Sequence, residues 1–147
     1  TLSLHDALPI YKLLDLDIVS PTAKVYSGKI KTIIAPGSLG GFQVMFNHAP
    51  LVSTLNVGKL KIVDENEKEK LYAISGGILE VNNNKVSVLA ENIETPEELN
   101  IERIKAAIAR YEDILHRKEE GTDPEEIRLL LKIEYNRLSL LNKLGLN

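Results

Sequence analysis

The chain has 147 residues, a length that fits one domain or two small ones. Hydrophobic residues make up 44% of it, enough for a packed core and too many for a disordered chain. The net charge of −3 gives no indication of a nucleic-acid partner, and the lack of cysteine excludes disulfides, thiolate zinc sites and cysteine nucleophiles. No apolar run approaches the roughly 20 residues that cross a bilayer, so we expect any membrane association to go through a partner.

The first ten residues differ from the rest of the chain. They read TLSLHDALPI and resemble the in-frame translation of a widely used sequencing adapter. We therefore expect residues 1–10 to derive from the adapter rather than from the gene. They are left out of the prediction of the fold, as cloning remnants are.

Charge and residue type change near residue 91. Residues 11–90 contain nine lysines, no arginine and seven acidic residues, whereas residues 91–147 contain four lysines, five arginines and thirteen acidic residues. Glycines cluster in the first half, and residues that favour helices dominate the second. We predict one domain over residues 11–92 and another over residues 93–147.

The first domain is predicted to be an antiparallel β-sandwich. Short runs rich in β-branched and aromatic residues recur between turn-forming residues, and several alternate in polarity. Many short strands with frequent turns are typical of a sandwich or barrel. Gly76-Gly77 is interpreted as a turn or a bulge between two strands. The predicted strands are Lys12–Val19, Lys29–Ala35, Phe42–Phe46, Leu60–Val63, Leu71–Ser75, Ile78–Val81 and Val86–Leu89.

The second domain is predicted to be an antiparallel two-helix hairpin, which makes the fold class α+β. Thr95-Pro96-Glu97-Glu98 has the pattern of a capping box with proline at the first helical position, and Asn100 is an alternative cap one turn later. Gly121 can end the first helix, and Asp123-Pro124 can begin the second. Glu134 lies within the apolar stripe of the second helix, where an unpaired carboxylate would be costly.

Residues that could carry chemistry are few in the predicted sandwich. The glycine-rich segment around Ser38, Leu39, Gly40 and Gly41 is followed by strand-like residues rather than a helix, so a turn is favoured over a phosphate loop. His48 is the only histidine of this domain, and a lone histidine builds neither a metal site nor a general base without partner groups. We therefore predict no catalytic residue and no metal site.

Arg103 and Arg110 are seven residues apart on one flank of the first predicted helix, about 10 Å along its axis. Asn100 lies on the same side. Two guanidinium groups at this spacing could clamp a nucleotide phosphate. A solvated face with ordinary ion pairs explains the same spacing more often. These three residues are therefore weak candidates for nucleotide binding.

Several short motifs follow one another along the chain: Leu16–Pro21, Val25–Gly28, Ala35–Gly37, Asn47–Leu51, Ser75–Val81 and Val86–Ala90. Their order and spacing, followed by a helical hairpin, resemble the epsilon subunit of F-type ATP synthases. Each motif alone is weak, and the series is specific. The resemblance covers residues 12–92 closely and residues 93–147 more loosely.

The resemblance implies a non-catalytic rotor subunit of the central stalk, without a cofactor, in a proton-translocating complex. Its sandwich would bind the gamma subunit and rest on the c-ring, with contacts expected around Ser38, Leu39, Gly40, Gly41 and His48. Its hairpin would permit turnover when packed down and restrain ATP hydrolysis when extended toward the catalytic alpha and beta subunits. The expected location is the cytoplasmic face of the bacterial inner membrane, reached only through the complex.

The chain departs from the family pattern in two places. Many relatives carry an acidic residue at the position of Gly41 and Pro-Gly at Phe46-Asn47, so a charged c-ring contact is in doubt. Some relatives bind ATP in the folded hairpin through Ile/Leu-Asp-x-x-Arg-Ala. Here the aspartate is replaced by Asn100 and the alanine by Ile104, which leaves ATP as no more than a candidate regulatory ligand.

Two other functions are compatible with the residues. One is a free-standing β-sandwich binding module with a helical appendage. A carbohydrate ligand would need aromatic platforms, and the chain has no tryptophan and only 5% aromatic residues. The other is a small nucleotide-binding regulator that uses Arg103 and Arg110.

Overall fold

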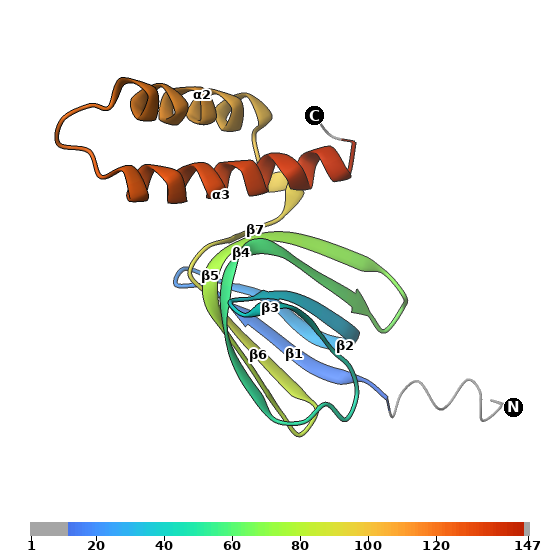
Figure 1. Ribbon diagram of the computed structural model, residues 1–147. Coiled ribbons are helices and arrows are strands. Elements are labelled where there is room, and N and C mark those ends of the chain that lie inside the picture. The colour runs from blue at the N-terminus through green and yellow to red at the C-terminus, as the bar shows by residue number, and fades with distance from the viewer. Residues whose placement is uncertain (1–11, 146–147) are drawn as a thin grey trace, which may run out of the picture. The chain divides into compact units, whose positions relative to one another are not determined.

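The structure is a computed structural model that describes residues 12–145 (Figure 1). The chain divides between Ile93 and Glu94 into two compact units. The predicted fold class is confirmed, because a β-sandwich is followed by an antiparallel two-helix hairpin. The prediction that residues 1–10 derive from an adapter concerns a segment outside the described residues.

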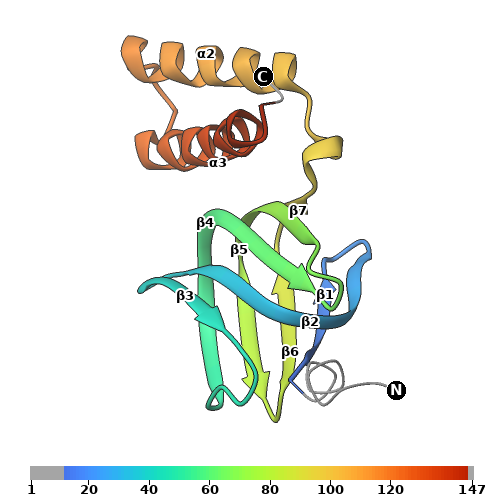
Figure 2. The same cartoon turned by 90° about the vertical axis from the view of Figure 1, so that its right-hand side faces the viewer.

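The strands of the first unit close on themselves. Their order in the sheet is β1-β6-β5-β4-β2-β3, and β1 also pairs with β2. The pair β1–β6 is parallel, and β1–β2, β2–β3, β2–β4, β4–β5 and β5–β6 are antiparallel. Figure 2 shows the long strands β2, β4 and β5 curving from one layer of the sandwich into the other. The strands are β1 (Leu14–Val19), β2 (Lys24–Gly37), β3 (Gly40–Val44), β4 (Leu51–Asp64), β5 (Glu69–Asn82) and β6 (Lys85–Ala90). The short strand β7 (Ile93–Glu94) spans the point at which the chain divides.

The core of this unit follows from strand alternation. Successive side chains of a strand point to opposite faces, so Leu14, Leu16 and Ile18 of β1 are buried while Asp15 and Val19 face outward. The same period on the other strands completes one cluster. Its buried members are Leu14, Leu16, Ile18, Ile30, Ile33, Ala35, Val44, Leu55, Leu60, Ile62, Tyr72, Ile74, Leu79, Val81, Val86, Val88 and Ala90.

Several predicted strand boundaries were wrong, and the largest errors concern β4 and β5. β4 begins at Leu51 rather than Leu60, because its first part pairs with β5 from Leu51 onward. β5 runs through Gly76 and Gly77 without a turn. Both glycines have positive φ, at 89° and 143°, and a Cβ on Gly77 would lie 2.4 Å from the carbonyl oxygen of Leu89. The glycine pair therefore lets two strands approach closely.

The hairpin of the second unit begins one turn later than the capping box suggests. The Thr95 box supports only the 3₁₀ turn η1 (Pro96–Glu98). Helix α2 (Ile101–Arg117) is capped by Asn100, whose Oδ1 accepts from the amide of Arg103 at 3.1 Å. The helix ends at Lys118, which adopts the left-handed conformation (φ 52°), and Gly121 lies beyond it in the connecting loop. The alternative N-cap, Asn100, is thus the right one for the first helix. That helix ends before Gly121, the residue predicted to end it.

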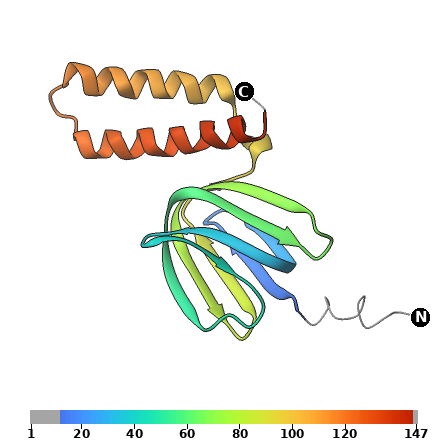
Figure 3. The same cartoon turned by 45° about the vertical axis from the view of Figure 1, so that its right-hand side comes forward.

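The two helices pack along each other. Helix α3 (Pro124–Lys143) starts at the N-cap Asp123 and runs antiparallel to α2, as Figures 1 and 3 show. Apolar residues at spacings of three and four form the inner faces of such a pair. The buried apolar side chains of this unit are Ile104, Ile127, Leu131, Leu140 and Leu141.

Candidate interaction surfaces

Of the predicted contact residues, Ser38 and Leu39 form the turn between β2 and β3, and Gly40 and Gly41 begin β3. Ser38 is anchored, because its amide donates to the carbonyl oxygen of Thr54 at 3.0 Å and its hydroxyl lies 2.7 Å from the Thr54 hydroxyl. Leu39 at the tip is fully exposed. Gly40 has a φ of 128°, which side chains rarely adopt, and Gly41 follows it in β3. The turn therefore presents an exposed apolar side chain, that of Leu39, rather than a charged one.

His48 lies in the loop at the opposite end of β3, so the structure does not bring it to the β2–β3 turn. Its Nδ1 lies 2.7 Å from the carbonyl oxygen of Ala49, and its amide donates to the carbonyl oxygen of Met45 at 3.1 Å. The loop is held by Asn84 in the β5–β6 turn. The amide of Asn47 donates to Oδ1 of Asn84 at 2.6 Å, and Nδ2 of Asn84 donates to Oδ1 of Asn47 at 3.2 Å.

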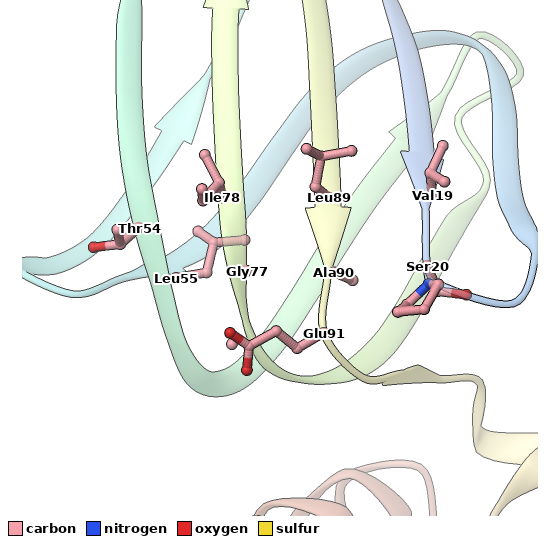
Figure 4. A pocket seen from close by; sticks show the side chains of 11 residues that line it. Val19, Ser20, Thr54, Leu55, Gly77, Ile78, Leu89, Ala90 and Glu91 are labelled. Atoms are coloured by element: carbon pink, nitrogen blue, oxygen red, sulfur yellow. The ribbon is translucent and has the colours of Figure 1, made fainter.

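A row of exposed apolar side chains crosses three strands of the first unit. Val19 of β1 pairs with Leu89 of β6, which pairs with Ile78 of β5. Their exposed fractions are 36%, 57% and 45%. Figure 4 shows the three side chains next to one another on adjacent strands. We call Val19, Ile78 and Leu89 the apolar row.

The apolar row borders an open groove of about 710 Å³, which Thr54 and Glu91 also line. Contiguous exposed apolar surface of this kind marks interaction sites more often than single exposed side chains do. No motif in the sequence predicted this row. Each of its residues does have an apolar neighbour in its own strand. Because successive side chains of a strand point to opposite faces, one member of each pair must face outward. The pairs are Ile18-Val19, Ile78-Leu79 and Val88-Leu89.

The three candidate nucleotide-binding residues lie together. Asn100, Arg103 and Arg110 line one cavity of about 360 Å³ in the second unit. The side-chain oxygen of Asn100 is engaged in capping α2. Arg110 donates from Nη2 to the hydroxyl of Tyr111 at 3.3 Å, and its guanidinium lies 5.0 Å from the centre of that ring. The structure thus groups these residues, with part of their bonding capacity used within the hairpin.

Acidic side chains balance the arginines of this cavity. Its lining contains Arg103, Arg110 and Arg137, and also Glu94, Glu98 and Glu134. An anion with several negative charges is attracted less strongly by a lining with equal numbers of acidic and basic side chains than by a basic lining. The cavity as it stands is therefore poorly suited to a triphosphate.

The predicted cost of Glu134 is resolved by an ion pair. Arg137 pairs with Glu134, three residues earlier on α3, and donates from Nε to Oε1 of Glu94 at 2.9 Å. Burial lowers the pKa of Arg137, but the hydrogen bonds and charges of Glu94 and Glu134 together outweigh it, so the net shift is upward. We call Glu94, Glu134 and Arg137 the ion triad. Sequence reasoning found Glu134 and missed its partners.

Comparison with known proteins identifies the family. Residues 13–96 match the family model described as the β-sandwich domain of the ATP synthase delta/epsilon chain. The ATP synthase epsilon chain of Desulforamulus reducens is 38% identical over 123 residues, which cover 84% of this chain and 92% of that protein. The chain belongs to the ATP synthase epsilon family. The epsilon chain of Brevibacillus brevis is 42% identical over 103 residues, covering 70% of this chain and 78% of that one.

Solved assemblies contain chains of the same fold as this epsilon-family chain. One belongs to the Euglena gracilis mitochondrial ATP synthase, with a TM-score of 0.79, 21% identity, and 88% of this chain and 81% of that chain covered. Another belongs to the central stalk and c-ring of the Tetrahymena thermophila mitochondrial enzyme, with a TM-score of 0.57, 15% identity, and 91% and 96% covered. At these identities the likeness concerns the fold.

Membership of the epsilon family confirms the predicted resemblance and makes the chain a non-catalytic stalk subunit. It sets aside the free-standing binding module. In residues 12–145, neither helix has the length and apolarity to span a bilayer. The described part of the chain holds no group of three or more potential metal ligands. The roles of Ser38–Gly41 and His48 in partner contacts, and of Asn100, Arg103 and Arg110 in nucleotide binding, stay predictions.

Proposed function

We propose that this epsilon-family chain couples the gamma subunit to the c-ring and restrains ATP hydrolysis through its hairpin. The division into two compact units supports two separable tasks. The observation that carries the coupling role is the apolar row, which lies on the outside of a sandwich that already has its own core. We place the chain, with its complex, at the cytoplasmic face of a bacterial inner membrane.

The apolar row is the proposed docking surface for gamma. A second row lies beside it, two residues away on each strand. It consists of Asp17, Ser87 and Glu80, which are neighbours in the sheet. An apolar strip beside a polar one has the composition of a protein interface, with an apolar centre and a polar rim. Burying exposed apolar area yields about 25 cal/mol per Å², so the row favours a partner that covers it.

The ends of β3 are the proposed contact with the c-ring. Residues 38–50 contain no aspartate, glutamate, lysine or arginine, so this contact would depend on Leu39, His48 and main-chain groups. The Asn47–Asn84 hydrogen bonds fix the loop that carries His48. A contact without formal charges should change little with salt.

The hairpin is the proposed regulatory element, with the catalytic alpha and beta subunits as its targets in the extended state. Helix α3 has 20 residues, a length of about 30 Å. It exposes Leu129 and Tyr135, at 50% and 45%, and carries Lys132 and Lys143 on its surface. A surface that is both apolar and basic suits acidic partners. Two packings of such an element need differ by only a few kcal/mol.

Deletion of residues 94–147 tests this division of labour. Membranes carrying the truncated chain should keep ATP synthesis and proton pumping, and their ATP hydrolysis should rise. Loss of coupling would show that the sandwich does not suffice for torque. Unchanged hydrolysis at every salt and nucleotide concentration would show that the hairpin is structural rather than regulatory.

A further inference from the structure

We propose that the ion triad is a charge latch. Arg137 of α3 holds Glu94, in the segment that leads into the hairpin, and Glu134 holds Arg137 in place. The folded hairpin is then set by its own charges, and it extends only when Arg137 releases Glu94. This inference rests on the proposed regulatory function and names the contact that controls it.

The position of the triad distinguishes it from an ordinary surface pair. The side chains of Arg137, Glu94 and Glu134 are exposed by only 23%, 27% and 12%. On the same helix and at the same spacing, Arg128 pairs with Glu125 at 2.6 Å, with exposed fractions of 58% and 82%. Exposed pairs contribute little, whereas removing one partner of a buried pair leaves an uncompensated charge.

The triad joins segments that are distant in sequence. Glu94 and Arg137 are 43 residues apart, and α2 and the connecting loop lie between them. A pair of this kind forms only when the chain has folded back on itself, so it reports and stabilises the folded hairpin. The pair Arg137–Glu134 is local to α3 and persists in either state. Only the bond to Glu94 is therefore sensitive to extension.

Removing Arg137 also unbalances the cavity. Glu94, Glu98 and Glu134 line it with Arg103 and Arg110, so loss of the third arginine leaves an excess of negative charge. Like charges in a partly buried space repel and favour the state that exposes them to water. Loss of Arg137 therefore destabilises the folded hairpin in two ways. It removes the attraction to Glu94, and it leaves the glutamates of the cavity to repel one another.

The first test uses amide hydrogen exchange of α3 in the full chain. Arg137→Met should accelerate exchange roughly 5- to 30-fold, the range that one or two kcal/mol produces. Arg128→Met, the matched control at an exposed pair, should change it less than about threefold. Glu94→Gln keeps the shape of the side chain and should accelerate exchange in the same direction, which covers the case in which Arg137→Met does not fold. Equal effects at Arg137 and Arg128 would overturn the latch.

A double-mutant cycle sharpens this test. If the bond between the two residues is the latch, Glu94→Gln should add little once Arg137→Met is present. Independent, multiplying effects on the exchange rate would mean that the two side chains act separately, and the proposal would be wrong.

The second test separates the latch from the regulatory function. In membranes, Arg137→Met should populate the extended hairpin and lower ATP hydrolysis relative to the unaltered chain, while Arg128→Met should not. If deletion of residues 94–147 leaves hydrolysis unchanged, the regulatory function fails while the exchange result still decides the latch. If deletion raises hydrolysis and Arg137→Met does not lower it, the latch does not control regulation.

Discussion

Asn47 and Asn84 hold two turns of the sandwich together through reciprocal hydrogen bonds of 2.6 and 3.2 Å. Both residues have positive φ, at 65° and 59°. Asparagine tolerates this conformation better than other residues with a Cβ, and its short amide can bond locally. The carbonyl oxygen of Asn84 also accepts from the amide of Asp15. One asparagine therefore ties the His48 loop and the start of β1 to the β5–β6 turn.

Substitutions at Asn47 should separate backbone strain from hydrogen bonding. Asn47→Gly keeps the main-chain donor to Asn84 and fits a φ of 65° without strain. Asn47→Ala keeps the same donor but forces a Cβ into the left-handed region, at a cost of about 1 kcal/mol or more. Urea unfolding should therefore rank the stabilities Asn47→Gly above Asn47→Ala. If both variants lose the same amount of stability, the whole effect comes from the lost hydrogen bond to Oδ1 of Asn47.

Residues 11–92 should fold without the hairpin. Every buried residue of the main hydrophobic cluster lies between Leu14 and Ala90, and several strands closed around one apolar interior can fold independently. A fragment of residues 11–92 should unfold cooperatively in urea and co-purify with gamma. A broad transition without a baseline would show that the fragment does not fold independently. Failure to bind gamma despite cooperative unfolding would show that the sandwich alone does not bind gamma.

The sequence predicted those parts of the fold that depend on local patterns. Alternation in β1 and the N-terminal proline of α3 were sufficient for their elements. The first part of β4 was missed, since Asn56 and Gly58 interrupt the apolar pattern and pairing with β5 determines the strand. Gly76-Gly77 was read as a possible turn because the glycine signal cannot distinguish a turn from two strands that approach closely.

The sites were less predictable than the fold because their partners are distant in sequence. Asn100, Arg103 and Arg110 share one helix flank, and helical spacing alone brought them together. The bond from Arg137 to Glu94 spans 43 residues, and no local pattern predicts it. The apolar row depends on register between three strands, although adjacent apolar residues such as Val88-Leu89 gave a partial signal.

The acid side of the stability profile should depend on Asp64. In the β4–β5 turn its Oδ1 accepts from the amides of Lys68 at 3.0 Å and Asn66 at 2.8 Å. The hydrogen bond from Lys68 is the largest cause that lowers the pKa of Asp64, and together with the hydrogen bond from Asn66 and the charges of Lys68 and Lys70 it outweighs desolvation. Because the folded pKa lies below the ordinary value of 3.8, the contribution is complete above that value and is lost as the pH falls through the folded pKa.

Asp64→Asn tests this dependence directly. The amide retains an oxygen acceptor but does not titrate, so the unfolding midpoint should fall less steeply between about pH 5 and pH 2 than in the unaltered chain. The two chains should converge at the acid end and differ most near neutrality. Parallel curves over the whole range would show that Asp64 does not contribute to acid sensitivity.

ATP should bind the isolated chain weakly, with a dissociation constant of about 1 mM or weaker, or not at all. Asn100 supplies no carboxylate and uses its oxygen to cap α2, and Ile104 is buried where the family signature has alanine. Arg137 is paired with two glutamates. Calorimetric titration measures the affinity. Tight binding that disappears in both Arg103→Ala and Arg110→Ala would restore nucleotide binding as a function of this cavity.

Binding of gamma should depend on the middle residue of the apolar row. Leu89 is 57% exposed and pairs on one side with Val19 and on the other with Ile78. Leu89→Asp places a charge between two apolar neighbours that the partner would cover. Fully burying a leucine is worth about 1.5–3 kcal/mol, and a buried unpaired carboxylate adds a desolvation cost. The dissociation constant for gamma should therefore rise at least about tenfold.

Leu39→Asp is the matched control for this prediction, because it makes the same chemical change at a fully exposed leucine outside the groove. It should leave gamma binding unchanged and affect only contacts made by the β2–β3 turn. Both leucines face away from the core, so both variants should unfold at nearly the same urea concentration as the unaltered chain. Weakened binding in Leu89→Asp alone, with stability preserved, identifies the apolar row as the gamma surface. If Leu89→Asp binds gamma normally, another face of the sandwich docks the stalk.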